Sequence, residues 1–127
     1  MIKKGIKQLI AEAEQRSSGI SVEDARKRIG DAGTVFVDIR DVRELEREGM
    51  IPGAFHAPRG MLEFWVDPES PYHNPAFQKD KTVLVYCASG GRSALVGKTL
   101  KDFGYGAVYN IGGFKELADA GLETEPA

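Results

Sequence analysis

The chain has few residues of several kinds, and each scarcity excludes a class of protein. Its 127 residues include a single cysteine, Cys87, so neither an internal disulfide nor a cysteine-based zinc cage can form within one chain. No apolar run approaches the roughly 20 residues that a membrane-spanning helix needs. The basic N-terminus leads into Glu12 and Glu14 rather than into an apolar signal core. We therefore expect a cytoplasmic protein that does not bind a membrane.

The chain also lacks a large excess of either charge. The formal net charge is −2 and no block of five or six like charges occurs, so the sequence does not predict nucleic-acid binding. The two histidines, His56 and His73, lack metal-ligand spacing, and we expect neither a metal nor another cofactor. With 42% hydrophobic and 28% charged residues, the composition is typical of one compact globular domain.

Three short runs rich in β-branched residues predict strands. The first two hardly alternate between polar and apolar residues, which is typical of strands buried on both faces of a parallel sheet. Between the second and third runs, an apolar stripe over Arg92–Phe103 predicts a helix that Gly104 ends. The pattern indicates an α/β fold with a central, mainly parallel sheet and helices on both faces. The three runs are Thr34–Val37, Thr82–Tyr86 and Ala107–Ile111.

The remaining segments predict shorter elements. Residues 1–20 are expected to form an N-terminal helical extension, broken at Ser17-Ser18-Gly19. We expect its apolar face to pack on the main domain over residues 21–127, the alternative being a partner protein. Ser21 and Asp24 resemble a capping box that opens a helix to about Ile29. Residues 51–80 hold five of the six prolines and should be mostly loop. A helical turn is expected within that loop at Met61–Trp65, and a last helix at Phe114–Ala120. The apolar face of the N-terminal extension consists of Ile2, Ile6, Leu9, Ile10 and Ala13.

The segment around Cys87 carries the strongest indication of chemistry. Cys87 follows a buried strand directly, at the carboxyl edge where open α/β sheets bind ligands. Gly90 and Gly91 let the backbone turn its N–H groups inward as an anion-binding nest. Arg92 and Ser93 add a positive charge and a hydroxyl donor. We therefore expect a lowered pKa for Cys87; the alternative is a small cysteine buried as ordinary packing.

Residues 87–92, Cys-Ala-Ser-Gly-Gly-Arg, resemble the Cys-x-x-Gly-x-Arg active loop of rhodanese-like domains. Three further segments resemble the family's motifs and occur in its order. The resemblance covers residues 34–122 and leaves the helix at residues 1–16 outside. It identifies the chain as similar to single-domain thiosulfate sulfurtransferases with a rhodanese-like fold. The further segments are Val35–Arg40, Gly49–His56 with Met50 in place of the common histidine, and Gly112-Gly113-Phe114 with phenylalanine for tryptophan.

The resemblance implies a sulfurtransferase in which Cys87 takes sulfane sulfur from thiosulfate or a persulfide donor. Cys87 would hold this sulfur as a persulfide and pass it to a thiol, a protein cysteine or cyanide. The acceptor must lie outside the chain because there is no second cysteine. Arg59 is a candidate for binding an anionic donor, the alternative being a solvated surface arginine. The loop residues expected to bind the persulfide are Ala88, Ser89, Gly90, Gly91, Arg92 and Ser93.

Two other functions remain open at this point. Some rhodanese-like domains are non-catalytic binding or regulatory modules, but here the cysteine is retained. Related phosphatases and arsenate reductases have five residues between cysteine and arginine, whereas Cys87 and Arg92 have four between them, which favours sulfur over the larger oxyanions. We expect Asp38 and Arg40 to brace neighbouring loops. His56 should be partly buried with its hydrogen bonds satisfied, and His73 should be exposed. Phe64 and Trp65 should pack in the core, the alternative being an apolar wall beside Cys87.

Overall fold

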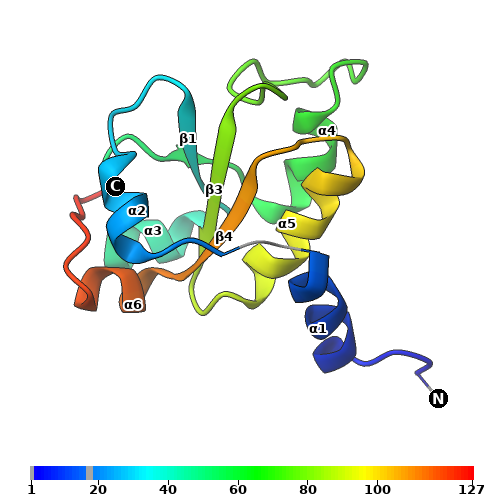
Figure 1. Cartoon of the computed structure of the whole chain (residues 1–127), viewed down its shortest axis with the longest axis horizontal. Coiled ribbons are helices and arrows are strands. Elements are labelled where there is room, and N and C mark those ends of the chain that lie inside the picture. The colour runs from blue at the N-terminus through cyan, green and yellow to red at the C-terminus, as the bar shows by residue number, and fades with distance from the viewer. Residues whose placement is uncertain (1, 17–18) are drawn as a thin grey trace.

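The computed structural model describes residues 2–16 and 19–127, and its helices and strands alternate along most of the chain (Figure 1). The expected break at Ser17 and Ser18 lies outside the described residues. The elements are α1 (Ile6–Arg16), α2 (Val22–Lys27), β1 (Thr34–Asp38), α3 (Val42–Glu48), β2 (Phe55–His56), the 3-10 turn η1 (Arg59–Met61), α4 (Leu62–Val66), β3 (Thr82–Cys87), α5 (Gly91–Asp102), β4 (Val108–Gly113) and α6 (Phe114–Asp119).

The four strands form one parallel sheet in the order β2-β1-β3-β4. Strands β1 and β3 pair in register from Thr34 opposite Thr82 to Asp38 opposite Tyr86. Strand β3 therefore lies inside the sheet, and it ends at Cys87. The carboxyl ends of parallel strands share one edge, so this edge gathers the loops that follow β1, β3 and β4.

Both faces of the sheet are covered by helices, which explains why β3 is apolar at almost every position. Val83, Val85 and Cys87 face a core that includes side chains of α4 and α5. Leu84 and Tyr86 face a second core that includes side chains of α2 and α6. Figure 1 shows the strands between these two groups of helices. The predicted α/β fold, with a parallel sheet and helices on both faces, is confirmed.

Two elements were not predicted. Helix α3 begins after Asp41, whose side chain accepts from the Arg43 amide while Glu44 accepts from the Asp41 amide. This capping box was a readable signal in the sequence that our interpretation missed. Strand β2 has only two residues, Phe55 and His56, and is too short to show a period. By contrast, the helical turn expected near Met61 is present as η1 and α4, and Ser21 caps α2 as expected.

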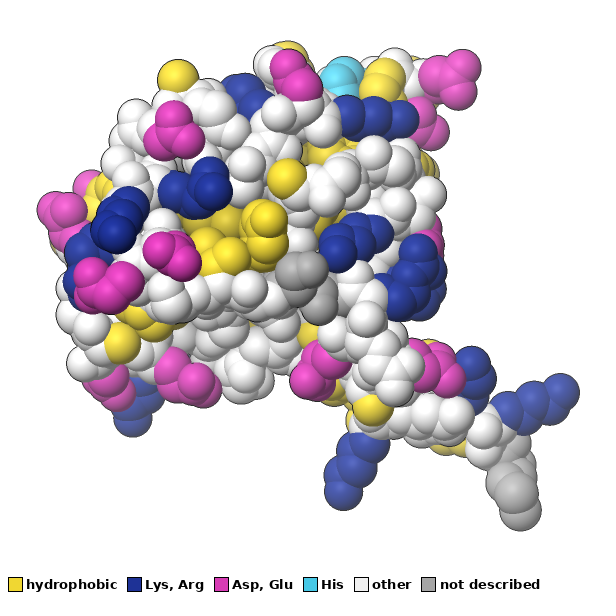
Figure 2. Space-filling model, viewed as in Figure 1, with side chains coloured by type: hydrophobic (Ala, Val, Ile, Leu, Met, Phe, Trp, Pro, Cys, Tyr) yellow, Lys and Arg dark blue, Asp and Glu magenta, His cyan; other side chains and the backbone are white. Residues whose placement is uncertain are grey.

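The N-terminal helix packs on the domain only along its second half. Helix α1 begins at Ile6, so Ile2 precedes it and is 81% exposed. Ala13 is buried, and Arg16 forms an ion pair with Asp102 at the end of α5. Ile6 is exposed, and Figure 2 shows the first half of the helix standing out from the body of the molecule. Leu9 is exposed as well, so the expected packing of the whole apolar face is wrong for its first three positions.

Candidate active site

Cys87 lies at the end of the interior strand β3, with its side chain fully buried. The loop that follows curls around the sulfur before α5 begins at Gly91. The Gly90 amide donates to Cys87 Sγ at 3.0 Å, and the Ser93 hydroxyl lies 3.4 Å from the same atom. The predicted cysteine, loop and hydroxyl are thus brought together around one sulfur.

The donors around the sulfur favour its thiolate form. Burial by itself raises the pKa of Cys87, because a charge is poorly solvated inside the protein. Hydrogen bonds from the Ser93 hydroxyl and from the amides of Ser93, Ser89 and Gly90 act in the opposite direction and prevail. The net result is a pKa below the ordinary value of a cysteine, which favours the thiolate relative to an ordinary cysteine.

Two glycines allow the loop to take this shape. Gly90 has φ +97°, a left-handed conformation that residues with a side chain rarely adopt. Gly113, at the end of β4, lies so close to the loop that a Cβ there would be 2.5 Å from the Ala88 carbonyl oxygen. Gly113 therefore permits close packing between β4 and the loop.

Arg92 is held by a residue that sequence reasoning missed. Its guanidinium donates to both carboxylate oxygens of Glu44 on α3, at 2.9 and 3.0 Å. This pairing raises the pKa of Arg92 and lowers the pKa of Glu44. Arg92 also interacts electrostatically with Cys87, which makes it a positive charge of fixed position beside the sulfur. The pair anchors the loop to the first turn of α3.

Asn110 on β4 is a second residue that the sequence did not reveal. Its Nδ2 donates to the Gly90 carbonyl at 3.1 Å, and its Oδ1 accepts from the Ser93 hydroxyl at 2.7 Å and from the Gly112 amide at 3.0 Å. The Ser93 hydroxyl has one proton and two acceptors within reach, Asn110 Oδ1 and Cys87 Sγ. Asn110 therefore holds the loop and competes with the sulfur for that proton.

Asp38 and Arg40 brace the same edge of the sheet, and His56 is partly buried and hydrogen-bonded there, as expected. Arg40 and Asp38 form a fully buried ion pair, with Arg40 Nη2 at 2.7 Å from Asp38 Oδ2. Arg40 also donates to the Gly49 carbonyl at 2.6 Å, which ties the end of α3 to β1. Half-buried His56 hydrogen-bonds the Arg40 carbonyl through Nε2 at 2.6 Å. These contacts are structural.

The loop between β2 and β3 gives a mixed result. Arg59 donates to Glu63 at 2.8 Å, and its role in substrate binding stays a prediction. Trp65 packs against the core with its ring 5.8 Å from that of Phe55, as expected. Phe64 is instead 53% exposed, because it packs only edge-on against the exposed Tyr72. His73 was expected to be exposed but is half-buried, because its Nδ1 bonds the Trp65 carbonyl at 2.9 Å.

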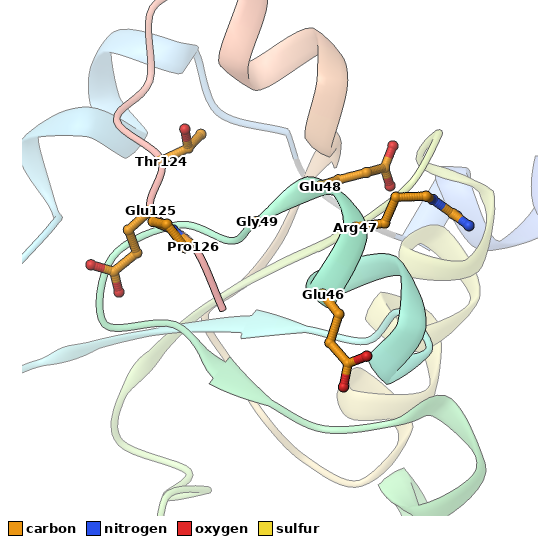
Figure 3. Close-up of a pocket in the computed structure, with 7 residues that line it drawn as sticks. All are labelled: Glu46, Arg47, Glu48, Gly49, Thr124, Glu125 and Pro126. Atoms are coloured by element: carbon orange, nitrogen blue, oxygen red, sulfur yellow. The ribbon is translucent and has the colours of Figure 1, made fainter.

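Cavities lie both beside the Cys87 loop and away from it. One of about 400 Å³ adjoins the loop and is lined by Ile10, Glu14, Ser89, Gly90, Gly91 and Asn110. Another, of about 330 Å³, lies where the end of α3 meets the C-terminal segment and does not include the Cys87 loop (Figure 3).

Within residues 2–16 and 19–127, no helix has the length and apolar character to cross a membrane, and no group of acidic, histidine or cysteine side chains is arranged to hold a metal.

These features define the class of protein: a parallel α/β domain with a cysteine sulfur at the centre of a loop whose amides point toward it. The chain belongs to the rhodanese-like domain family, whose model matches residues 21–120. It is 35% identical over 105 residues to a sulfurtransferase of Allochromatium vinosum, covering 81% of this chain and 90% of that protein. It is 32% identical over 90 residues to a tRNA sulfurtransferase of Desulfurococcus amylolyticus, covering 71% of this chain but only 16% of that longer protein.

Solved structures show the same fold. A protein of unknown function from Rhodopseudomonas palustris, described as a possible tyrosine phosphatase, has a TM-score of 0.91 at 47% identity, covering 98% of this chain and 97% of that chain. The polysulfide-sulfur transferase homodimer of Wolinella succinogenes has a TM-score of 0.71 at 28% identity, with coverage of 91% and 83%. The predicted family and fold are therefore confirmed.

Proposed function

We propose that this protein is a sulfurtransferase that carries sulfane sulfur as a persulfide on Cys87. The observation that carries the proposal is the lowered pKa of a buried thiol surrounded by inward-pointing donors. Its membership of the rhodanese-like domain family and its similarity to sulfurtransferases support the same reaction. The donor is thiosulfate or a persulfide, and the acceptor is a thiol, a protein cysteine or cyanide.

The reaction has two displacement steps. The Cys87 thiolate attacks the outer sulfur of thiosulfate, the sulfur–sulfur bond of thiosulfate breaks, and sulfite leaves with the electron pair. The terminal sulfur of the resulting persulfide keeps a negative charge, which the amides of the loop stabilise in place of water. An acceptor thiolate then attacks that terminal sulfur, and the Cys87 thiolate leaves. The enzyme returns to its starting state.

Phosphate-ester hydrolysis is the second candidate, because the similar protein from Rhodopseudomonas palustris is described as a possible tyrosine phosphatase. The loop here has four residues between Cys87 and Arg92, one fewer than in the phosphatase loop. The Arg92 guanidinium is also bound by both oxygens of Glu44, which reduces its capacity to bind a phosphate in the bidentate manner. Both features support sulfur transfer.

Intact-protein mass spectrometry tests the proposal. After incubation with thiosulfate or a small persulfide, the wild-type chain should gain one sulfur atom, about 32 Da, and cyanide should remove it. The Cys87→Ser variant should gain nothing. An aryl phosphate assay run in parallel tests the phosphatase alternative. Absence of the gain with both donors would contradict the proposal, and phosphate release that depends on Cys87 would replace it.

A further inference from the structure

The cavity of about 400 Å³ beside the Cys87 loop has one wall that the family match does not include. Three of its lining residues, Ser89, Gly90 and Gly91, belong to the loop itself. Ile10 and Glu14 come from α1, which precedes the matched residues 21–120. Gly90, which lines the cavity, donates its amide to Cys87 Sγ at 3.0 Å, so the cavity adjoins a residue in direct contact with the reacting atom.

Helix α1 is held firmly enough at this point to act as a wall. The Ile10 side chain lies against the loop, since a Cβ on Gly91 would be 3.3 Å from Ile10 Cδ1. Ala13 is completely buried, and Arg16 is paired with Asp102 at the far end of α5. Glu14 lies on the same turns of the helix and lines the cavity. Its position beside the loop is thus fixed by contacts on both sides along the chain.

The cavity has a negative charge that no neighbour neutralises. Glu14 is the one ionisable residue among the six that line it. Within residues 2–16 and 19–127, no hydrogen bond or ion pair engages the Glu14 side chain, and Arg16 of α1 and Arg92 of α5 are paired with Asp102 and Glu44. An unpaired carboxylate beside an apolar isoleucine suits a ligand with a short apolar body and a cationic group.

We propose that this cavity receives the sulfur acceptor and selects thiols that carry a positively charged amine, with Glu14 binding the ammonium group. The inference rests on the proposed sulfur transfer and names the class of its acceptor. Glu14 is a specificity-determining residue here and takes no part in bond breaking. An anionic donor such as thiosulfate gains nothing from this carboxylate, so donor and acceptor are distinguished by charge.

The charge balance of the second step favours such an acceptor. An acceptor thiolate must approach the terminal sulfur of Cys87–S–S⁻, and both reactants are anions. The new bond joins the acceptor sulfur to the terminal sulfur, the Cys87 sulfur–sulfur bond breaks, and the products are an acceptor persulfide and the Cys87 thiolate. An ammonium group on the acceptor reduces the repulsion between the two anions, and Glu14 holds this group beside the loop. The persulfide also extends the reacting atom about 2 Å beyond the buried Sγ.

The first test measures transfer from the preloaded Cys87 persulfide to two thiols of similar size, cysteamine and 3-mercaptopropionate. The Glu14→Gln variant should lower kcat/KM for cysteamine relative to 3-mercaptopropionate by about fivefold, the size expected when a partly exposed ion pair of about 1 kcal/mol is lost. Glu14→Lys should lower this ratio further. Glu12→Gln is the matched control, because Glu12 is already paired with Lys4 and should leave the ratio unchanged. For each thiol, kcat/KM of the variant is divided by kcat/KM of the wild type, so the different intrinsic reactivities of the two thiols cancel.

A second test does not depend on persulfide chemistry. Cys87 is the only thiol, so its modification by aminoethyl and by sulfonatoethyl methanethiosulfonate can be followed by intact mass. The wild-type preference for the cationic reagent should fall by about fivefold in Glu14→Gln and should persist in Glu12→Gln. If Cys87 accepts no sulfur but this preference shifts, the proposed function fails while the charge-selective cavity stands. Ratios that stay within twofold of wild type in both Glu14 variants overturn the inference.

Discussion

At the scale of single residues, the site depends on how many donors face one sulfur. The sulfur of Cys87 is buried, which would ordinarily keep it protonated, yet the amides of the loop and the Ser93 hydroxyl prevail over this effect. Ser93 is itself fully buried and shared with Asn110, so its proton position responds to the charge on the sulfur. A thiolate attracts that proton more strongly than a thiol does.

We predict that Ser93→Ala raises the pKa of Cys87, because it removes a hydroxyl donor from the thiolate. The rate of alkylation by iodoacetamide against pH should therefore reach its midpoint at higher pH in this variant. Ser89→Ala is the matched control, since it removes an exposed hydroxyl and keeps the amide that serves the sulfur. Equal midpoints in wild type and Ser93→Ala would show that the Ser93 hydroxyl donates to Asn110 Oδ1 and not to the sulfur.

The same shift has a consequence for stability. The pKa of Cys87 is lower in the folded chain than in the unfolded chain, so the unfolded state binds the proton more tightly. The thiolate therefore contributes stability that is fully present above the unfolded pKa and is lost as pH falls through the folded pKa. In Ser93→Ala this contribution should be smaller, and the rise in stability with pH over that window should be shallower.

At the scale of elements, α3 links the two sides of the site. Glu44 accepts from the Asp41 amide, which completes the cap of α3, and it also binds Arg92 at the start of α5. One side chain thus joins a helix terminus to the Cys87 loop. Glu44 and Arg92 are 48 positions apart in the sequence, so no local sequence pattern predicts their contact.

We predict that Glu44→Ala lowers the free energy of unfolding by about 1–2 kcal/mol, from the loss of half the capping box and of a partly exposed ion pair. Glu46→Ala on the same helix should change it by less than about 0.5 kcal/mol, because exposed substitutions away from caps and pairs have little effect. Urea denaturation followed by circular dichroism measures both. A loss in Glu44→Ala no larger than in the control would mean that the pair with Arg92 is not formed in solution.

The sequence predicted those parts of the fold and site that are contiguous along the chain. The cysteine, its glycines and Arg92 lie within six consecutive residues, and the strand before them is apolar throughout because both of its faces are buried. Glu44 and Asn110 reach the loop from α3 and β4, and only the packing of those elements reveals them. Strand β2 was missed because two residues of parallel pairing leave no pattern.

At the scale of the whole molecule, α1 is an addition to a domain that the family model defines from residue 21. We predict that a chain lacking residues 1–19 still folds, with a free energy of unfolding lower by about 1–3 kcal/mol because the apolar contact of α1 with α5 is lost. Urea denaturation and the far-ultraviolet circular dichroism spectrum test this. An unfolded truncated chain would mean that α1 is part of the core domain and that the boundary near residue 20 is wrong.

The interior position of β3 determines how the thiol can become accessible. Strand β3 is hydrogen-bonded on both sides, to β1 and to β4, so its amides exchange with solvent only when a large cooperative unit of the protein opens. The amides of the loop after Cys87 bond to the sulfur rather than to a neighbouring strand, so they should exchange faster than those of β3. We therefore expect access to the sulfur to depend on local fluctuation of the loop rather than on opening of the sheet. Amide hydrogen exchange would separate the two motions. The exchange rates of β3 amides would measure global unfolding, and those of the loop amides would measure the local opening that admits small molecules.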